Sequence, residues 1–344
     1  MTELVIKACG PRTSLQDQGR IGSQRYGVSN SGAMDRLALA AANVLVGNAS
    51  GTGAIEFMLL GGTFTAEGGS LRVAVAGAPC AVALDGQPVP SSTTLVVAPG
   101  QTFTIGPMRI GVYAYLAVAG GFDLEPRLGS QSLHHRAALG GFRGRAFAAG
   151  DRVPLRAAKA PDDGPLLRLP QVPVAADAAI RVVMGPQDDY FTPAGHDTLL
   201  SGAYVVTQEA DRMGYRLTGP RIEHAKGFNI VSDGIVSGSV QVPGSGEPIV
   251  MMADRQTTGG YPKIATVISA DLREVAQRRP GDTLRFERVA MAEAQRLARS
   301  RAAEIAALPT LARPVHGGLP SPEELFGLNL AGAAVDALSS DEHP

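Results

Sequence analysis

Apolar and polar positions alternate along most of this chain in short runs, with glycine and proline between them. In the first half, apolar runs of strand length recur at close intervals: Leu4–Ala8, Ala54–Leu60, Leu71–Ala76, Ala81–Leu84, Thr93–Val97, Thr102–Ile105 and Ile110–Val118. Short runs separated by turn-forming residues are typical of β-sandwiches and barrels rather than of alternating strands and helices. The pattern therefore predicts a mainly β fold with a few helices.

Two segments have helical spacing instead. Asp35 precedes apolar residues at positions 37, 38, 41, 42 and 45, and Gly47 follows them, which predicts a helix with Asp35 as its N-cap. Met291–Leu308 combines alanines with charged residues four positions apart and predicts a second helix. Ser29 and Ser31, just before the first helix, either cap it or bind an anion at its N-terminus, and capping is the commoner use.

The second half of the chain is also rich in strand-sized runs. They lie at Ile180–Met184, Ala203–Thr207, Tyr215–Leu217, Phe228–Val231 and Gly238–Val242. Residues 157–178 are rich in Ala, Pro and Asp and show no periodicity, which indicates a connection between domains. We predict a first domain over 1–160, a linker over 161–178, a second domain over 179–308 and a flexible tail over 309–344, with a possible short helix at Pro322–Leu328.

In the segment Pro248–Leu272, two apolar runs flank a polar, turn-prone stretch that begins at Asp254 and ends at Lys263. If the two runs pair as antiparallel neighbours, this carboxylate and this ammonium face each other across the connection, with Cβ atoms about 4.5–5.5 Å apart. Of the 31 basic residues only four are lysines, so a lysine beside an apolar strand suggests a compact, titratable charge. A salt bridge that closes a hairpin explains the same pattern, and both interpretations stay open.

A second polar, glycine-rich loop, Leu128–Arg145, contains His134 and His135. Adjacent histidines on an extended segment point in opposite directions, so they are poor joint ligands of a metal. The sequence is compatible with two interpretations: one of the two histidines faces a site, or both are ordinary polar residues of a loop. The two cysteines, Cys9 and Cys80, form neither a disulfide framework nor a metal site, and we predict no metal.

Composition narrows the class of protein. A length of 344 residues fits two domains, and a hydrophobic content of 44% is enough for each domain to bury a hydrophobic core. A net charge of −1 gives no reason to expect a nucleic acid or an anionic membrane as partner. No apolar stretch is long enough to span a bilayer, and the N-terminus lacks the pattern of a signal peptide. We therefore expect a soluble, cytoplasmic protein.

Six motifs together resemble the signatures of one family: Gly10–Arg20, Gly27–Asp35, Leu116–Phe122, Asp211–Leu217, Gln241–Gly246 and Asp254–Lys263. The family is variously called KipA-like, allophanate hydrolase subunit 2, biotin-dependent carboxyltransferase and the C subunit of 5-oxoprolinase. The resemblance covers roughly residues 3–290. It implies two cyclophilin-like β-barrel subdomains. It also implies a KipI-like partner (the B subunit of 5-oxoprolinase, or allophanate hydrolase subunit 1), with a third oxoprolinase subunit as a further candidate.

The resemblance also implies a site. In carboxyltransferase relatives an Asp and a Lys of a similar stretch take part in substrate handling, and here they correspond to Asp254 and Lys263. The surrounding motifs supply further candidates for substrate binding, which are Arg212, Gln241, Arg255, Gln256, Thr257 and Tyr261. Family members usually carry a Ser-Thr-His version of the segment Leu133–Arg136, so the resemblance assigns a role to neither histidine.

Small amide-like substrates such as 5-oxoproline or urea need a base near the N–H and cationic or N–H donors near the carbonyl oxygen. We expect Asp254 to accept or orient the N–H and Lys263 to stabilise oxyanion or phosphoryl charge, with help from the Gly259 and Gly260 amides. An arginine, Arg212 or Arg255, suits the carboxylate of 5-oxoproline.

Three functions fit the resemblance. The first is a subunit of an ATP-dependent 5-oxoprolinase, which opens the lactam of 5-oxoproline to glutamate. The second is the carboxyltransferase component of a urea or amide carboxylase that uses carboxybiotin. The third is a non-enzymatic antagonist of a KipI-like kinase inhibitor. The chain has no Met-Lys-Met biotinylation motif and no P-loop, so any ATP is used by the complex, and we favour the first function.

Overall fold

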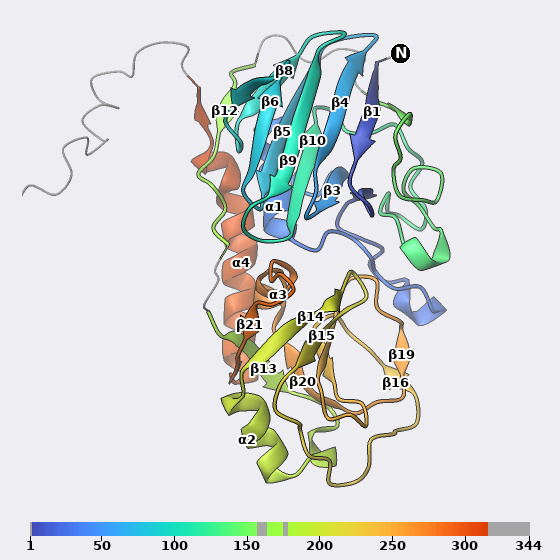
Figure 1. The fold of residues 1–344 in the computed structure, drawn as a ribbon, viewed down its shortest axis with the longest axis vertical. Coiled ribbons are helices and arrows are strands. Elements are labelled where there is room, and N and C mark those ends of the chain that lie inside the picture. Colours follow the sequence, from blue (N-terminus) through green and yellow to red (C-terminus); the bar gives the residue numbers. More distant parts are fainter. Residues whose placement is uncertain (1, 157–163, 175–177, 316–344) are drawn as a thin grey trace, which may run out of the picture.

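The computed structural model describes residues 2–156, 164–174 and 178–315. Two β-rich subdomains lie one above the other, and a long helix runs along one side of both (Figure 1). The prediction of a mainly β chain with a few helices is confirmed, with four α-helices in the described part of the chain. Four short 3-10 helices accompany them, η1 (Gln24–Tyr26), η2 (His135–Ala137), η3 (Asp188–Tyr190) and η4 (Ser269–Asp271).

The first subdomain packs two antiparallel sheets face to face. One has the order β11 (Arg152–Pro154), β1 (Glu3–Cys9), β4 (Gly62–Glu67), β9 (Thr102–Met108), β6 (Cys80–Leu84) and β7 (Gln87–Val89). The other has the order β2 (Ser14–Gln16), β3 (Ala54–Met58), β10 (Tyr113–Val118), β5 (Leu71–Gly77) and β8 (Thr94–Val97). Phe57, Phe64 and Phe103 are fully buried between them, with ring centroids 5.3–5.8 Å apart. The alternation of apolar residues in the sequence thus corresponds to one continuous core.

Helix α1 (Arg36–Leu45) covers the outer face of the second of these sheets, where it packs on β5 and β10. Asp35 is its N-cap, as predicted, and its carboxylate accepts hydrogen bonds from the amides of Leu37 and Ala38 at 3.1 and 3.0 Å. The helix is almost entirely buried, because its other side meets the second subdomain and the long helix. It therefore lies at the boundary between the two subdomains.

The second subdomain is built on one eight-stranded sheet. Its order is β21 (Thr283–Leu284), β14 (Tyr204–Ala210), β15 (Gly214–Thr218), β18 (Ile249–Met251), β17 (Ser239–Gln241), β20 (Lys263–Val267), β13 (Ile180–Met184) and β22 (Phe286–Arg288). Strand β17 lies between β18 and β20, so the hypothesis that the two apolar runs around Asp254 and Lys263 pair directly is wrong. A small separate ribbon pairs β16 (Asp233–Gly234) with β19 (Thr258–Gly259).

Two other expectations for the second half need correction. Residues Phe228–Val231 form no strand, and Val231 is 93% exposed. Helix α2 (Pro193–Ser201) is absent from the sequence prediction, although Thr192 caps it through the amide of Gly195 and proline occupies its first position. Helix α3 (Leu272–Ala276) follows β20 and packs toward the first subdomain.

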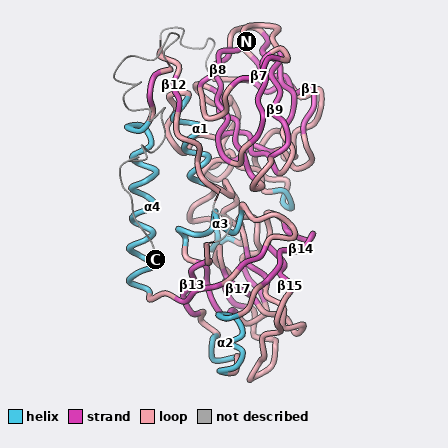
Figure 2. Tube along the Cα trace, turned by 60° about the vertical axis from the view of Figure 1, so that its left-hand side comes forward, coloured by secondary structure: helices cyan, strands magenta, loops and turns pink. Residues whose placement is uncertain are grey.

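The long helix α4 (Met291–Leu311) contains the predicted segment and continues three residues beyond it. It packs on α1 and runs beside both subdomains (Figure 2). After it, β23 (Arg313–Pro314) pairs with β12 (Leu167–Arg168), which lies in the predicted linker. Residues 309–315 thus belong to the fold rather than to a flexible tail, whereas the proposed helix at Pro322–Leu328 lies outside the described residues.

Buried polar contacts join the subdomains beside α1. The side-chain oxygen of Gln277 accepts hydrogen bonds from the amides of Val112 and Tyr113, and its nitrogen donates to Asp35 at 2.9 Å. Arg273 also pairs with Asp35, at 3.1 Å. The same carboxylate that caps α1 therefore receives two groups from the second subdomain, which fixes how the subdomains meet.

Candidate active site between the two subdomains

A buried ion-pair network holds the predicted residues Arg212 and Asp254. Arg212, in the turn between β14 and β15, donates to both carboxylate oxygens of Asp254 at 2.9 and 3.0 Å. It also donates to Glu56 of β3 at 2.5 Å, so the network crosses between subdomains. All three side chains are at most 3% exposed. Burial alone raises the pKa of Asp254, but the adjacent Arg212 outweighs it and holds that pKa below its usual range.

Close packing of two polar loops places this network. Arg212 donates to the carbonyl of Gly32 at 2.8 Å, and Gly32 has a φ of 87°. A Cβ at this position would lie 2.8 Å from the backbone nitrogen of Gly19, so glycine is needed where the loops of residues 10–20 and 27–35 touch. The two motifs that resemble family signatures thus meet at the same buried point.

Lys263 has a different partner. Its ammonium donates to Asp233 at 2.8 Å, and its side chain is 2% exposed whereas that of Asp233 is 52% exposed. The hydrogen bond from Lys263, with further donors from Gln187 and Gly234, lowers the pKa of Asp233 to about 2. Asp254 and Lys263 therefore do not face each other as a pair, because each has a separate partner of opposite charge.

A cavity of about 680 Å³, with several polar side chains on an otherwise apolar lining that includes Met213, Ile249 and Met251, lies beside the network. Three of the predicted substrate-binding residues line it, together with arginines of the first subdomain: Gln241, Gln256, Tyr261, Arg12 and Arg136. Arg12 pairs with Asp211 of the second subdomain at 2.8 Å. Arg136 is exposed and directs its guanidinium to the sulfur of Met213 at 3.7 Å. We refer to this space as the polar cavity.

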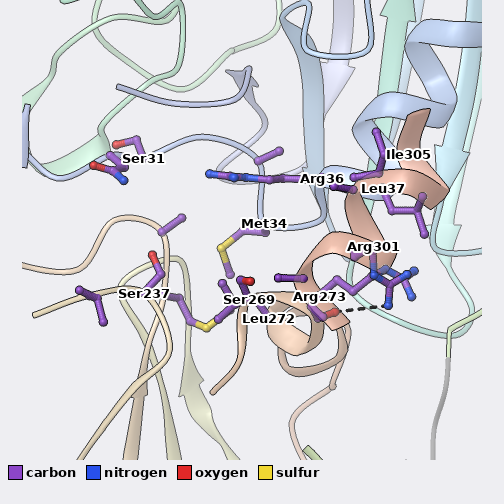
Figure 3. Close-up of a pocket in the computed structure, with 18 of the residues that line it drawn as sticks. Ser31, Met34, Arg36, Leu37, Ser237, Ser269, Leu272, Arg273, Arg301 and Ile305 are labelled. Atoms are coloured by element: carbon purple, nitrogen blue, oxygen red, sulfur yellow. Dashed lines mark hydrogen bonds between the residues drawn. The ribbon is translucent and has the colours of Figure 1, made fainter. Parts of the chain in front are cut away.

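A second cavity of about 450 Å³ lies beside α1, α3 and α4, and we refer to it as the arginine cavity (Figure 3). Arg255 lines it and is 2% exposed. The next residue, Gln256, lines the polar cavity instead, so these two neighbours lie at different cavities. The predicted substrate-binding residues are therefore divided between two spaces. Thr257 lines neither, and its carbonyl accepts a hydrogen bond from the amide of Ile235 at 2.9 Å.

The two adjacent histidines have different surroundings in the structure. His134 caps η2 by accepting a hydrogen bond from the amide of Ala137 at 3.3 Å. The Nε2 atom of His135 is buried and, among the residues that the structure describes, has no hydrogen-bond partner. Burial, aided by the charge of Arg212, lowers the pKa of His135 to about 4. His135 is therefore a neutral imidazole next to the Arg212–Asp254 pair.

This lowered pKa predicts a pH dependence of stability. In the unfolded chain His135 has an ordinary pKa of about 6.5, so between pH 6.5 and 4 the unfolded state binds the proton more readily. Stability is expected to fall as the pH drops through this window, and His135→Gln should remove part of that fall. Urea unfolding at pH 7.5 and pH 5.0 measures it. An unchanged difference between the two pH values in the variant would show that His135 is not the buried neutral group.

Sequence patterns do not identify every residue of this region. Glu56 is absent from the predicted site, although it is a carboxylate inside the otherwise apolar strand Ala54–Met58. One oxygen of Glu56 accepts from Arg212. The other accepts hydrogen bonds from the amide of Met34 at 3.0 Å and from the hydroxyl of Tyr115 at 2.7 Å, so both oxygens have donors. A charge within a buried strand is the signal that the sequence offers, because such a charge needs a buried partner.

Two general features of the described residues bear on function. No group of three or more His, Cys, Asp or Glu side chains among them is placed to hold a metal ion. None of their helices has the length and apolar character needed to cross a membrane.

Comparison with known proteins gives the family. Residues 26–288 match the model of the carboxyltransferase domain, subdomain A and B. The C subunit of 5-oxoprolinase from Haemophilus influenzae is 40% identical over 288 residues, which are 84% of this chain and 92% of that protein. The protein of the same name from Escherichia coli is 37% identical over 293 residues, 85% of this chain and 93% of that protein.

A solved structure extends the comparison. The urea amidolyase of K. lactis superimposes with a TM-score of 0.81 and 28% identity, over 89% of this chain but 20% of that one. The resemblance inferred from the motifs is confirmed, since relatives and solved structure agree with the family model. The chain belongs to the carboxyltransferase-domain family that contains the C subunit of 5-oxoprolinase and a domain of urea amidolyase.

Proposed function

We propose that this chain is the C subunit of an ATP-dependent 5-oxoprolinase, which opens the lactam of 5-oxoproline to glutamate. The observation that carries the proposal is the match to two proteins of that name over 92% and 93% of their lengths. In this reaction the lactam C–N bond breaks and one water adds across it, while a second water is consumed as ATP is converted to ADP and phosphate. The chain works with a KipI-like subunit and a third oxoprolinase subunit, and the nucleotide is used by the complex.

The polar cavity suits the substrate. The lactam carbonyl and the carboxylate of 5-oxoproline both accept hydrogen bonds, and Gln241, Gln256 and Arg136 supply N–H donors at this cavity; the side-chain oxygen of either glutamine can accept from the lactam N–H. The sequence also suggests Arg212 for the carboxylate, but its donors are already occupied by Asp254, Glu56 and Gly32. We therefore assign carboxylate binding to Arg136, which forms no ion pair within the described residues.

Lys263 retains its proposed catalytic role. Lys263 is not among the residues that line the polar cavity, but on strand β20 it pairs with Gln241 of β17, which does line it, at a β-bulge between Val240 and Gln241. Its ammonium is a compact charge that suits a developing oxyanion or a phosphoryl group. Asp254 contributes by holding Arg212, since both of its oxygens accept from that guanidinium.

A second function has its own support. The match to urea amidolyase extends over 89% of this chain, and the same cavity would admit urea or another small amide as acceptor of the carboxyl group of carboxybiotin. The two functions differ in whether the substrate carries a carboxylate. Recognition of that carboxylate is therefore the discriminating property.

The test is steady-state kinetics of the complex with its KipI-like partner. Arg136→Gln should raise the KM for 5-oxoproline at least tenfold, because a hydrogen bond to a charged group contributes about 1.5–3 kcal/mol. The effect on kcat should be smaller. Arg25→Gln is the matched control, since Arg25 is exposed, stacks on Tyr26 and lies outside the cavity. An unchanged KM in Arg136→Gln would show that 5-oxoproline does not bind in this cavity.

A further inference from the structure

The arginine cavity combines cationic side chains with an apolar wall, and the proposed reaction does not use it. Its polar side includes Arg36, Arg255, Ser31 and Ser237, which come from both subdomains. In Figure 3 the Arg36 side chain extends across the space above Met34, with Ser31 toward one end and the α4 residues Arg301 and Ile305 toward the other. A volume of about 450 Å³ is within the range of small-molecule sites.

Two of the four arginines that line this cavity already have acidic partners. Arg273 pairs with Asp35 and Glu274, and Arg301 pairs with Glu304 at 2.7 Å. Their charges are therefore matched within the protein. The unmatched positive charge must come from the other two.

Arg36 is the donor with free capacity. Within the described residues it forms no ion pair, and one nitrogen donates to the carbonyl of Gln18 at 3.3 Å. A guanidinium has five N–H groups, so a bidentate pair remains for a ligand. The protein atoms around its guanidinium partly exclude water and lower the pKa of Arg36, and no carboxylate of the described chain opposes this effect. Arg36 stays accessible to solvent, as a ligand-binding group must.

Arg255 adds a second positive charge at the other side. Its hydrogen bonds go to neutral acceptors, the carbonyls of Ile235 and Met252 and the side chains of Ser237 and Gln24. The nearest acid, Asp254, already gives both oxygens to Arg212. Burial lowers the pKa of Arg255 to about 10, although Asp254 opposes this. The guanidinium is therefore a fixed cation with little hydrogen-bonding capacity left.

The remaining wall is apolar. It is formed by Met34 and Leu37 at α1, Met252 after β18, Leu272 at α3 and Ile305 on α4. A free inorganic anion would leave this surface in contact with water, whereas a ligand with an apolar body would cover it.

We propose that the arginine cavity binds a small organic carboxylate with an apolar body, separately from the substrate site. Arg36 forms the bidentate contact, Arg255 supplies a second positive charge, and the apolar wall holds the body. Because the walls come from both subdomains and from α4, an occupied cavity stabilises their arrangement.

Titration calorimetry of the full chain tests this proposal, with hexanoate as probe. Hexanoate should bind, and its affinity should fall at least about tenfold in Arg36→Gln, the loss expected for a charge-assisted contact. Ala298→Leu keeps the charges but narrows the cavity, and it should weaken hexanoate binding as well. Arg299→Gln is the control, because Arg299 is exposed on the same helix outside the cavity.

Comparison ligands test the contributions of the carboxylate and of the apolar chain of hexanoate separately. Acetate, hexanol and inorganic phosphate should each bind more weakly than hexanoate, and hexanoate should raise the melting temperature of the wild type more than that of Arg36→Gln. Absence of hexanoate binding to the wild type, equal affinity in Arg36→Gln, or tighter binding of phosphate than of hexanoate would each overturn the proposal.

Discussion

Arg212→Gln is expected to lower the free energy of unfolding by about 3–5 kcal/mol, the effect of removing one partner from a buried ion pair. Arg212 is the cation between two buried carboxylates, Glu56 at 2.5 Å and Asp254 at 2.9 Å. Without it, two negative charges remain in a space from which water is excluded. The loss should appear in urea unfolding at pH 7.

The pH dependence of the stability of Arg212→Gln provides a second, independent test of the network. In the wild type the pKa of Asp254 lies below its usual range, so its stabilising contribution is present above about pH 4 and is lost as the pH falls through the folded pKa. In Arg212→Gln burial is no longer opposed, and protonation of the acid then relieves the repulsion. The deficit should therefore be larger at pH 8 than at pH 5.

Two further variants check the cause. Arg296→Gln breaks an exposed pair with Glu293 on α4 and should leave the free energy of unfolding close to the wild-type value, because solvent screens this pair. Adding Asp254→Asn to Arg212→Gln should recover part of the lost stability, because one of the unpaired charges is gone. A free energy of unfolding for Arg212→Gln close to the wild-type value would contradict the assigned network.

Lys263→Met is expected to lower kcat of the assembled enzyme at least about 100-fold, the scale of removing one group that stabilises transition-state charge. The variant keeps an apolar stem in the buried position of Lys263 and removes the ammonium. Its former partner Asp233 is half exposed and can be solvated, so the fold should persist. Turnover under substrate saturation measures the effect.

A matched control exists for this variant. Lys226 also pairs with a carboxylate, that of Asp189, but both side chains are exposed. Lys226→Met should therefore keep the wild-type kcat. Substantial residual turnover in Lys263→Met, together with a native unfolding curve, would show that this ammonium is not catalytic.

Local patterns in the sequence predict the strands and α1 because their causes are local. Alternation at Thr102–Ile105 reflects the two faces of a strand, and Asp35 caps the helix through the next three residues. The order of strands has no such local cause. Insertion of β17 between β18 and β20 depends on contacts between distant segments, and it is what separates Asp254 from Lys263.

The same distinction applies to the site. Motifs identify Arg212 and Asp254, but Glu56, the second carboxylate that pairs with Arg212, is 156 positions from Arg212 and belongs to the other subdomain. The division of Arg255 and Gln256 between two cavities occurs just after a turn, where neither residue belongs to a strand, so strand alternation does not predict it. Local patterns do not predict the cavities either, because each is closed by the packing of both subdomains.

The most direct test of the proposed function is ADP release by this chain co-purified with its KipI-like partner, measured with and without 5-oxoproline. The proposal predicts that 5-oxoproline stimulates ADP release, that glutamate accumulates with it, and that both collapse in Lys263→Met. The contradicting result is ADP release that does not respond to 5-oxoproline, while urea or a related amide accepts the carboxyl group of carboxybiotin.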